Sequence, residues 1–468
     1  MPNLREPILA GSWYPADPGV LTREVDGYIA GAEGPAGNGD RLKAVIAPHA
    51  GYRFSGPVAG SAYARVAAIA ARIERVVLVG PSHRHAFEGI AVPTDTAFSS
   101  PLGEIPIDLA AIRDIQRLPQ VVALDAAHAR EHSLEIHLPF LQRALGSFTL
   151  VPLVVGRASP GAVAEVLANL WGGHETLIVI STDLSHYLDY ETCRRLDART
   201  SQAIVSGNCD AIGDDQACGR GGVKGLLRLL EGSAATIELL DLRNSGDTQG
   251  ARDRVVGYGS WSVSEPEGGL ADRRMTALGH GRLMLGIARA AIRQGLASDR
   301  PPVINWERVP GALKEDGAAF VTINLNGRLR GCIGSLVAHR PLAEDIAQNA
   351  WKAAFKDPRF APLTQEEFAR CEIEISLLSP HTPFAFRDEA DLIARLRPGR
   401  DGLTLQEGDK RALFLPSVWE GIPDPATFVQ RLKQKAGWAP DHWSDAIRAT
   451  RFTTEKVSAQ TIRAFAER

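Results

Sequence analysis

The sequence has few cysteines, and they are not arranged in pairs. Its 468 residues include five cysteines, at positions 193, 209, 218, 332 and 371, with no C-x-x-C spacing. An odd number of scattered cysteines is typical of a reducing compartment rather than of a disulfide framework. The pattern also excludes a cysteine-ligated iron–sulfur cluster of the radical-SAM type within this chain.

The sequence also lacks long apolar runs and a strong net charge. No apolar run approaches the roughly 20 residues that cross a bilayer. The opening Met-Pro-Asn-Leu-Arg-Glu-Pro has neither the basic segment nor the apolar core of a signal peptide. A formal net charge of −3 favours neither a nucleic-acid surface nor a membrane patch. We therefore expect a cytoplasmic protein that binds neither nucleic acid nor membrane.

The pattern of apolar residues divides the chain into two parts. Over residues 1–265, short Val/Ile/Leu runs alternate with helical stretches, which predicts a doubly wound α/β domain with a mostly parallel sheet. Residues 266–272 have linker composition. From residue 273 to 468, hairpin signals dominate, the strongest being Asn326-Gly327 between two apolar runs. The expected organisation is thus an α/β domain, a linker and a separate α+β domain.

Three apolar runs in the first part each end at a histidine. Lys43–Ala47 leads to His49, Arg75–Gly80 leads to His83, and Thr176–Ile180 leads through Asp183 to His186. Such runs are typical of buried parallel strands. Ligands bind outside the carboxyl ends of strands in such sheets, and imidazole is the commonest metal ligand and general base. One strand-end histidine would favour a capping role, but three in the same context predict a site.

Two short motifs offer further, weaker signals. His128-Ala-Arg-Glu-His132 fits the H-x-x-E-H pattern of some zinc peptidases, although Pro139 interrupts the helix that would carry it. Cys218-Gly-Arg-Gly-Gly222 precedes a helix and would suit either an anion at a helix N-terminus or a plain glycine turn. Neither pattern decides the chemistry by itself.

Five ordered motifs stand in residues 1–265, which are Ala10-Gly-Ser-Trp-Tyr-Pro15, Ala47-Pro-His-Ala-Gly-Tyr-Arg-Phe-Ser-Gly56, Gly80-Pro-Ser-His83, Glu131-His-Ser-Leu-Glu-Ile-His-Leu-Pro139 and Ser181-Thr-Asp-Leu-Ser-His186. With these motifs, residues 1–265 resemble the Memo family. That family is similar in fold and site layout to the LigB-type class III extradiol dioxygenases. Those enzymes hold non-haem Fe(II) with two histidines and a carboxylate and use a further histidine as acid/base.

The resemblance implies roles for the strand-end residues. It makes His49 and His83 the imidazole ligands of a metal ion and His186 the catalytic acid/base. Fe(II) is the implied metal, with Cu or Zn as the alternatives. Asp183, three residues before His186, could orient its ring and fix its tautomer, or it could cap the helix after the strand.

The third ligand is where this sequence departs from the family pattern. In the best-known animal members a cysteine fills that position, within a stretch that matches Arg243-Asn-Ser-Gly-Asp-Thr-Gln249 here. Asp247 is the available carboxylate and would complete a facial set of two histidines and one carboxylate. The alignment also permits Thr248 at this position. Alternatively, Asp247 is an ordinary turn residue with no role in metal binding.

His132 and Glu135 match the family motif and are expected within one helical turn of each other. They could be pocket residues or support the ligands, or they could be satisfied polar groups at a helix N-terminus. If the H-x-x-E-H pattern of residues 128–132 held zinc instead, the domain would be a zinc hydrolase.

The second part carries its own set of motifs, which are Leu329-Arg-Gly-Cys-Ile-Gly-Ser335, Phe355-Lys-Asp-Pro-Arg-Phe-Ala-Pro-Leu363, Glu374-Ile-Ser-Leu-Leu-Ser-Pro380, Phe414-Leu-Pro416 and Lys435-Ala-Gly437. With these motifs it resembles the AMMECR family over roughly residues 272–468. The candidate functional residues are Cys332, Arg330 and Arg359. Cys332 is either a reactive thiol with cationic neighbours or a packed strand residue. The two arginines, with Asp357, either bind an anionic ligand or form a structural ion-pair network.

The two families together resemble the prokaryotic AmmeMemoRadiSam system, whose third member is a separate radical-SAM protein. The resemblance implies that protein as a partner. The leading expectation is an Fe(II)-dependent, extradiol-dioxygenase-like oxidoreductase that acts on an unknown small or aromatic substrate. The alternative is a non-enzymatic protein whose pocket binds a metal or docks a peptide or partner.

Overall fold

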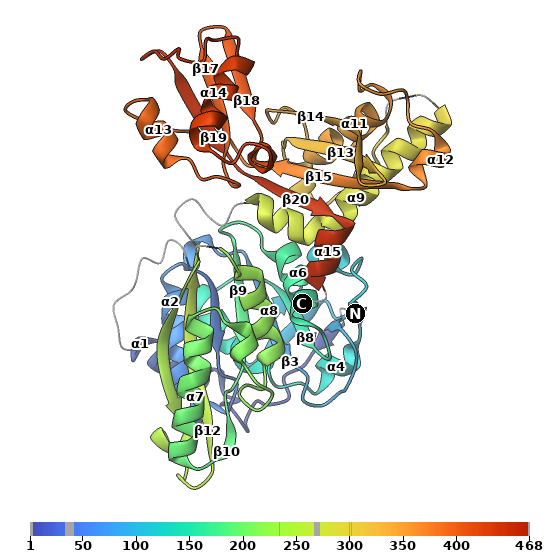
Figure 1. Ribbon diagram of the computed structural model, residues 1–468. Coiled ribbons are helices and arrows are strands. Elements are labelled where there is room, and N and C mark those ends of the chain that lie inside the picture. Colours follow the sequence, from blue (N-terminus) through green and yellow to red (C-terminus); the bar gives the residue numbers. More distant parts are fainter. Residues whose placement is uncertain are drawn as a thin grey trace. The chain divides into compact units, whose positions relative to one another are not determined.

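The computed structural model describes residues 3–32, 42–233, 235–265, 272–298, 300 and 302–466. The chain divides into two compact units, Met1–Leu270 with Ala464–Arg468, and Ala271–Arg463. Each unit is described by itself (Figure 1). The predicted linker at 266–272 falls almost entirely outside the described residues. No helix in the described part of the chain is long and apolar enough to cross a membrane.

The first unit is built on a large mixed sheet, which confirms the α/β class. Its strand order is β10-β12-β2-β9-β3-β8-β4-β7, with β11 paired to β12. A three-stranded sheet, β1-β5-β6, lies apart from it. The strands are β1 (Leu4–Arg5), β2 (Leu42–Ala47), β3 (Arg75–Pro81), β4 (Ile90–Val92), β5 (Ala97–Ser100), β6 (Gly103–Pro106), β7 (Val121–Ala123), β8 (Thr149–Val155), β9 (Thr176–Ser181), β10 (His186–Leu188), β11 (Thr236–Asn244) and β12 (Val255–Ser264).

The centre of this sheet is parallel and its margins are partly antiparallel. β2, β9, β3 and β8 run in one direction, whereas β12 joins β2 antiparallel and β4 joins β8 antiparallel. All six residues of β2 and all six of β9 are buried. Helices therefore cover both faces, and the strands are continuous apolar runs rather than alternating ones.

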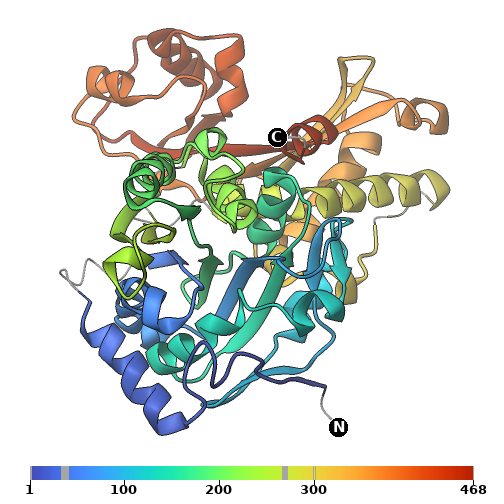
Figure 2. The same ribbon diagram turned by 90° about the horizontal axis from the view of Figure 1, so that it is seen from below.

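Helices cover the two faces of the sheet in the manner of a doubly wound fold (Figures 1 and 2). α2 packs on β2 and β12, with α1 and α5 against it, whereas α8 packs on β3 and β9, with α6 against it. The β2–α2–β3 and β8–α6–β9 crossovers progress in opposite directions along the sheet, so right-handed connections place their helices on opposite faces. The helices are α1 (Pro18–Ala30), α2 (Tyr52–Ala67), η2 (Ala70–Arg72), α3 (Leu109–Ile115), α4 (Asp125–Ala129), η3 (Glu135–His137), α5 (Leu138–Leu145), α6 (Pro160–Leu170), α7 (Tyr190–Val205), η4 (Cys209–Ala211), α8 (Arg220–Leu230) and η5 (Ser245–Asp247).

The second unit contains two four-stranded sheets, β14-β13-β15-β20 and β16-β19-β17-β18. Its strands are β13 (Ala319–Leu325), β14 (Arg328–Gly334), β15 (Cys371–Leu378), β16 (Thr382–Pro383), β17 (Gly402–Glu407), β18 (Lys410–Phe414), β19 (Arg448–Phe452) and β20 (Thr454–Ser458). Its helices are α9 (Asp272–Ser298), η6 (Trp306–Arg308), α10 (Gly311–Lys314), α11 (Leu342–Phe355), α12 (Gln365–Phe368), α13 (Glu389–Arg395), η7 (Pro416–Glu420) and α14 (Pro425–Lys435), and α15 (Ala459–Ala466) follows β20.

The predicted hairpin of the second unit forms at Asn326-Gly327. Both residues adopt positive φ, 50° and 73°, as a two-residue turn between β13 and β14 requires. α11 packs on both of these strands, and the core between them includes Val321, Ile323 and Ile346.

Candidate metal centre

The carboxyl ends of three neighbouring strands deliver the predicted residues to one edge of the sheet. β2 and β9 pair in parallel with Ala47 opposite Ser181, so the segments carrying His49 and Asp183 leave the sheet side by side. β3, which pairs with β9 on its other side, leads to His83. The parallel register therefore brings His49 and His83 together, with ring centroids 5.2 Å apart.

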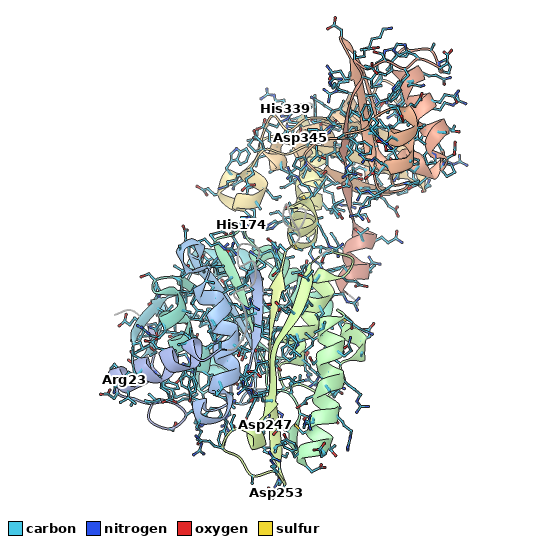
Figure 3. The ribbon with its side chains drawn as sticks, turned by 90° about the vertical axis from the view of Figure 1, so that its left-hand side faces the viewer. Arg23, His174, Asp247, Asp253, His339 and Asp345 are labelled. Atoms are coloured by element: carbon cyan, nitrogen blue, oxygen red, sulfur yellow. The ribbon has the colours of Figure 1, made fainter. Side chains whose placement is uncertain are left out.

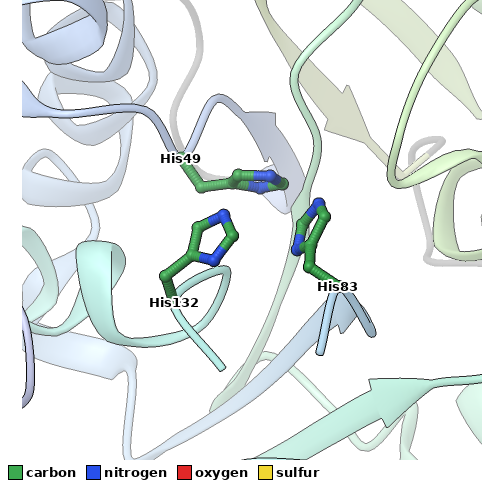
Figure 4. A group of neighbouring side chains, drawn as sticks. All are labelled: His49, His83 and His132. Carbon is green, nitrogen blue, oxygen red and sulfur yellow. The ribbon is translucent and has the colours of Figure 1, made fainter. Parts of the chain in front are cut away.

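A third histidine joins them from outside the sheet. His132 follows α4, and one ligand atom of each of His49, His83 and His132 lies within 4.8 Å of the other two (Figure 4). The His132 ring is stacked 4.3 Å from that of His83 and lies 5.5 Å from that of His49. Its Nδ1 is buried and lies 3.4 Å from a carboxylate oxygen of Glu131. Imidazole is the commonest metal ligand, so three rings with ligand atoms this close together could hold a metal ion.

The buried carboxylate of Glu131 organises this group. It accepts hydrogen bonds from His83 Nδ1 at 2.8 Å and from the His83 backbone N–H at 2.6 Å. It also accepts from the backbone N–H groups of His132 and Ser133, each at 3.0 Å. Burial raises the pKa of Glu131, but the hydrogen bonds from His83 outweigh it and lower the pKa to about 2. The ionised carboxylate thus holds a proton on His83 Nδ1, which leaves Nε2 free as a ligand atom.

A second buried network fixes the tautomer of His49. The Ser181 hydroxyl donates to the carbonyl of Ser133 at 2.6 Å, and it lies 2.6 Å from His49 Nδ1 and 2.9 Å from His137 Nε2. A hydroxyl has one proton, so its oxygen must accept from both imidazoles. His137 Nδ1 in turn accepts from Tyr63 Oη at 2.8 Å. His49 therefore carries its proton on Nδ1 and presents the Nε2 lone pair.

Burial lowers the pKa values of His49 and His132 and so keeps both rings able to bind a metal. Burial, followed by the neighbouring histidines, lowers the pKa of His49 below its ordinary value. Burial lowers the pKa of His132 to about 4. Because a metal binds only the neutral imidazole, these shifts favour ligation at neutral pH. Imidazole donors suit Zn, Cu and Fe, so the residues present fit a first-row transition metal.

The site opens into a cavity of about 850 Å³. His49, His83, His132, Asp183 and His186 all lie on its wall, together with the aromatic residues Trp13, Tyr14, Phe54, Tyr187 and Tyr258 and the cationic residues Arg53 and Arg84. A space of this size accommodates a small organic molecule beside the three imidazoles.

Asp183 and His186 share the cavity, and each has a backbone partner of its own. The Asp183 carboxylate accepts from the His49 backbone N–H at 2.8 Å and from that of Ala50, so it shapes the turn that carries His49. Burial raises the pKa of Asp183 to about 7. The His186 ring bonds to the backbone of Leu184, and its partial burial lowers its pKa. Its ring is thus oriented by a carbonyl rather than by Asp183.

The structure does not bring the expected third ligand, Asp247 or Thr248, to the histidines. Asp247 lies in the η5 turn between β11 and β12 (Figure 3), where its carboxylate accepts from Tyr190 Oη and from the backbone N–H of Asn244. The Thr248 hydroxyl donates to the carbonyl of Ser245 at 3.2 Å. Within the described part of the chain neither residue belongs to the group of ligand atoms. The third member of the group is His132, and the contacts of Asp247 are those of a turn residue.

Glu135 and His128 also lie outside the centre. Glu135 pairs with Arg5 at 3.0 Å and accepts from Leu9 N and Tyr14 Oη, so it anchors the N-terminal segment. His128 Nε2 lies 3.1 Å from the carbonyl of Ala91. α4 ends at Ala129, so His128 and His132 do not share a helix. The structure therefore does not place His128 and His132 as a pair of zinc ligands on one helix, as the zinc-hydrolase interpretation requires.

The candidate residues of the second unit form ion pairs. Arg330 binds both carboxylate oxygens of Glu367, at 2.9 and 3.0 Å. Arg359 binds Asp357, which also accepts from the backbone N–H of Cys332 at 2.9 Å. Cys332 Sγ lies 3.3 Å from Thr322 Oγ1 in the neighbouring strand. These contacts favour the structural network over an anion site and a packed strand cysteine over a reactive thiol.

Sequence reasoning missed Glu131, Ser181 and His137 as parts of the site. All three are buried and stand inside the motifs around His132 and His186. Each of these polar residues stands in a stretch whose other residues are typical of a hydrophobic core. Because buried polar groups need partners, such residues could have been recognised as parts of a network.

Comparisons with known proteins agree with the division into two parts. A family model described as Memo-like protein matches residues 5–262. A second model, described as AMMECR1, matches residues 285–457. Each match falls within one of the two compact units.

Curated relatives match the first unit. A MEMO1 family protein of Archaeoglobus fulgidus is 34% identical over 268 residues, which span 54% of this chain and 97% of that protein. One of Ignicoccus hospitalis is 35% identical over 280 residues, spanning 54% of this chain and 96% of that protein. A crystal structure of an uncharacterized protein from Pyrococcus horikoshii is 31% identical, with a TM-score of 0.34 over 38% of this chain and 89% of that one.

Proposed function

The chain belongs to the Memo-like family and carries an AMMECR1 domain in the same polypeptide, and from this premise we propose that its first unit is a metal-dependent oxidoreductase of the extradiol-dioxygenase type. The proposed metal is Fe(II), and the proposed substrate is a small aromatic molecule. The observation that carries the proposal is the meeting of His49, His83 and His132 on the wall of a cavity of about 850 Å³.

The three histidines would hold the ion, and Glu131 and Ser181 would fix two of their rings. When bound, Fe(II) would pass electrons from the aromatic substrate, which is the species oxidised, to dioxygen. An ion with three protein ligands keeps open positions for small molecules. The histidine trio thus leaves room for a substrate on the cavity side.

His186 is the proposed acid/base. One ring nitrogen bonds to the backbone of Leu184, so the other is free to accept a proton from a substrate hydroxyl and to return it. The lowered pKa of the ring keeps it neutral, which is the form a base needs at neutral pH. Aromatic residues on the cavity wall favour a flat substrate, and Arg53 and Arg84 favour a negatively charged one.

The proposal extends to partners and compartment. The presence of both domains in one chain supports a link to the AmmeMemoRadiSam system and hence a separate radical-SAM protein as a partner. The five cysteines are all free, which supports a cytoplasmic location.

A second candidate is a metal-binding or docking protein without oxygen chemistry. The histidine trio favours it, because three histidines without a carboxylate also suit Zn or Cu. Both candidates use the same metal site, but only the oxidoreductase would convert a substrate.

Anaerobic metal loading followed by oxygen uptake tests the proposal. Protein loaded with Fe(II) should bind about one ion, and His49→Ala or His83→Ala should abolish binding. His186→Ala should retain the metal but lose oxygen uptake with catechol-type substrates. A bound ion with no uptake across a broad phenolic panel would favour the second candidate. No binding of Fe, Cu or Zn would overturn both.

A further inference from the structure

Tyr187, the residue after His186, combines an unusual backbone with an exposed aromatic ring. Its φ is 61°, in the left-handed region that a bulky side chain rarely adopts. Among the non-glycine residues that the structure describes, only Asn326 also has a positive φ, and the hairpin turn at Asn326-Gly327 accounts for it. Tyr187 lies within strand β10 instead, where no such turn requires this conformation.

Tyr187 is the extra residue of a β-bulge. β10 and β12 pair antiparallel, with His186 opposite Val256. The next pair is Leu188 with Val255, so β10 advances two residues where β12 advances one. Glycine is the usual residue at a left-handed position in a bulge, because it has no Cβ atom. The chain therefore carries an aromatic ring at a position where the backbone by itself favours glycine.

The bulge turns two neighbouring side chains toward the same cavity. Successive residues of a regular strand point to opposite faces, whereas His186 and Tyr187 both lie on the wall of the cavity of about 850 Å³. Their ring centroids are 5.7 Å apart, and the ring planes are inclined at 68°. Tyr187 is 63% exposed, so its ring adds little to the core. Bulges beside active sites re-aim side chains in this way.

We propose that Tyr187 selects an aromatic substrate, by packing its ring against the ring of a molecule that binds beside His186. This inference rests on the proposed function and names a substrate contact within the same cavity. Two aromatic rings attract each other at centroid distances of ~4.5–7 Å, in offset or edge-to-face arrangements. Backbone strain that the fold does not need is typical of such ligand-binding positions.

Arg254 restrains the ring before a substrate arrives. Its guanidinium carbon lies 5.2 Å from the centroid of the Tyr187 ring, which is a cation–π contact. The left-handed backbone and this contact together limit the positions that the side chain can take. A substrate therefore meets a surface that is already ordered, and less conformational entropy is lost on binding.

Anaerobic calorimetric titration of the Fe(II)-loaded protein with two probes tests the proposal. One probe is 4-nitrocatechol, and the other is oxalate, a non-aromatic anion that also binds metal ions. In Tyr187→Ala the affinity for 4-nitrocatechol should fall about three- to tenfold, whereas the affinity for oxalate should stay within about twofold of wild type. Tyr187→Phe keeps the ring and should bind both probes within about twofold of wild type.

Two further variants separate a binding role from a structural one. Tyr190 also lies under a guanidinium, that of Arg252 at 4.4 Å, but it is not among the residues that line the cavity. Tyr190→Ala should therefore leave both affinities unchanged. Tyr187→Gly should lose the same affinity for 4-nitrocatechol as Tyr187→Ala, yet it should resist urea better, because glycine adopts the left-handed backbone without strain.

The outcomes distinguish this inference from the proposed function. If Tyr187→Ala binds 4-nitrocatechol as tightly as the wild type, or loses affinity for both probes equally, Tyr187 does not select an aromatic ring and the proposed function still stands. An equal loss in Tyr187→Phe or in Tyr190→Ala would overturn the inference as well. If the Fe(II)-loaded wild type binds oxalate but not 4-nitrocatechol, the aromatic substrate of the proposed function fails together with this inference.

Discussion

Replacing Glu131 by glutamine should weaken the metal centre without changing its ligands. The carboxylate holds His83 through Nδ1 and the backbone, and it also holds the backbone of His132. A glutamine of the same size lacks the negative charge and can no longer accept from all of these donors. Groups of this kind typically contribute 10–100-fold to metal affinity, or about 1.4–2.7 kcal/mol.

The same substitution should reduce stability in a pH-dependent way. The pKa of Glu131 falls from 4.5 in the unfolded reference to about 2 in the folded protein. A lowered carboxyl pKa stabilises the fold above the unfolded value, and that contribution is lost as pH falls from 4.5 towards 2. The shift corresponds to roughly 3 kcal/mol. Denaturant unfolding of the metal-free protein should thus show a smaller loss of stability on acidification in Glu131→Gln than in the wild type.

Glu135→Gln is the matched control. Glu135 is equally buried and accepts hydrogen bonds from the N-terminal segment, so its replacement should destabilise the unit. It touches none of the three histidines, and the metal affinity of folded Glu135→Gln should stay within about threefold of wild type. Equal losses of affinity in the two variants, or an unchanged affinity in Glu131→Gln, would refute the assignment of Glu131 as the residue that positions His83.

Four further outcomes follow. His132→Ala should abolish or strongly weaken metal binding in calorimetry whereas Asp247→Ala should not, and the reverse would restore the carboxylate as third ligand. Limited proteolysis should first cut between about Ser262 and Arg274 and release two cooperatively unfolding fragments; an initial cut well inside either unit would contradict the boundary. Burial lowers the pKa of Lys43 to about 8, so between pH 8 and 10.5 the unfolded chain keeps a proton on Lys43 that the folded protein has lost. The free energy of unfolding should therefore rise across this range, by about 3 kcal/mol. Urea unfolding checks this, because Lys43→Met should lack the rise. Cys332 should react with iodoacetamide no faster than the buried cysteines, and selective rapid labelling would make it a functional thiol.

The ends of the parallel strands were predictable from the sequence because each end depends only on the residues of one short segment. A buried parallel strand is a continuous apolar run, so the position where it stops is visible, and parallel pairing then brings His49 and His83 to one edge. The turn at Asn326-Gly327 was predictable for the same reason, since the two residues by themselves favour the required positive φ.

The third histidine of the group was not predictable in this way. His132 lies in an irregular segment after α4, and its place beside His83 depends on the hydrogen bonds that Glu131 makes across the fold. Asp247 had the right chemistry and lies in a family motif, but its carboxylate serves the turn between β11 and β12.

Anomalous diffraction from crystals of the metal-loaded protein tests the central claim most directly. The account predicts one peak within ~2.0–2.2 Å of a ring nitrogen of each of His49, His83 and His132. A peak coordinated by Asp247 in place of His132, or no peak at the histidines after loading with Fe, Cu and Zn in turn, would contradict it.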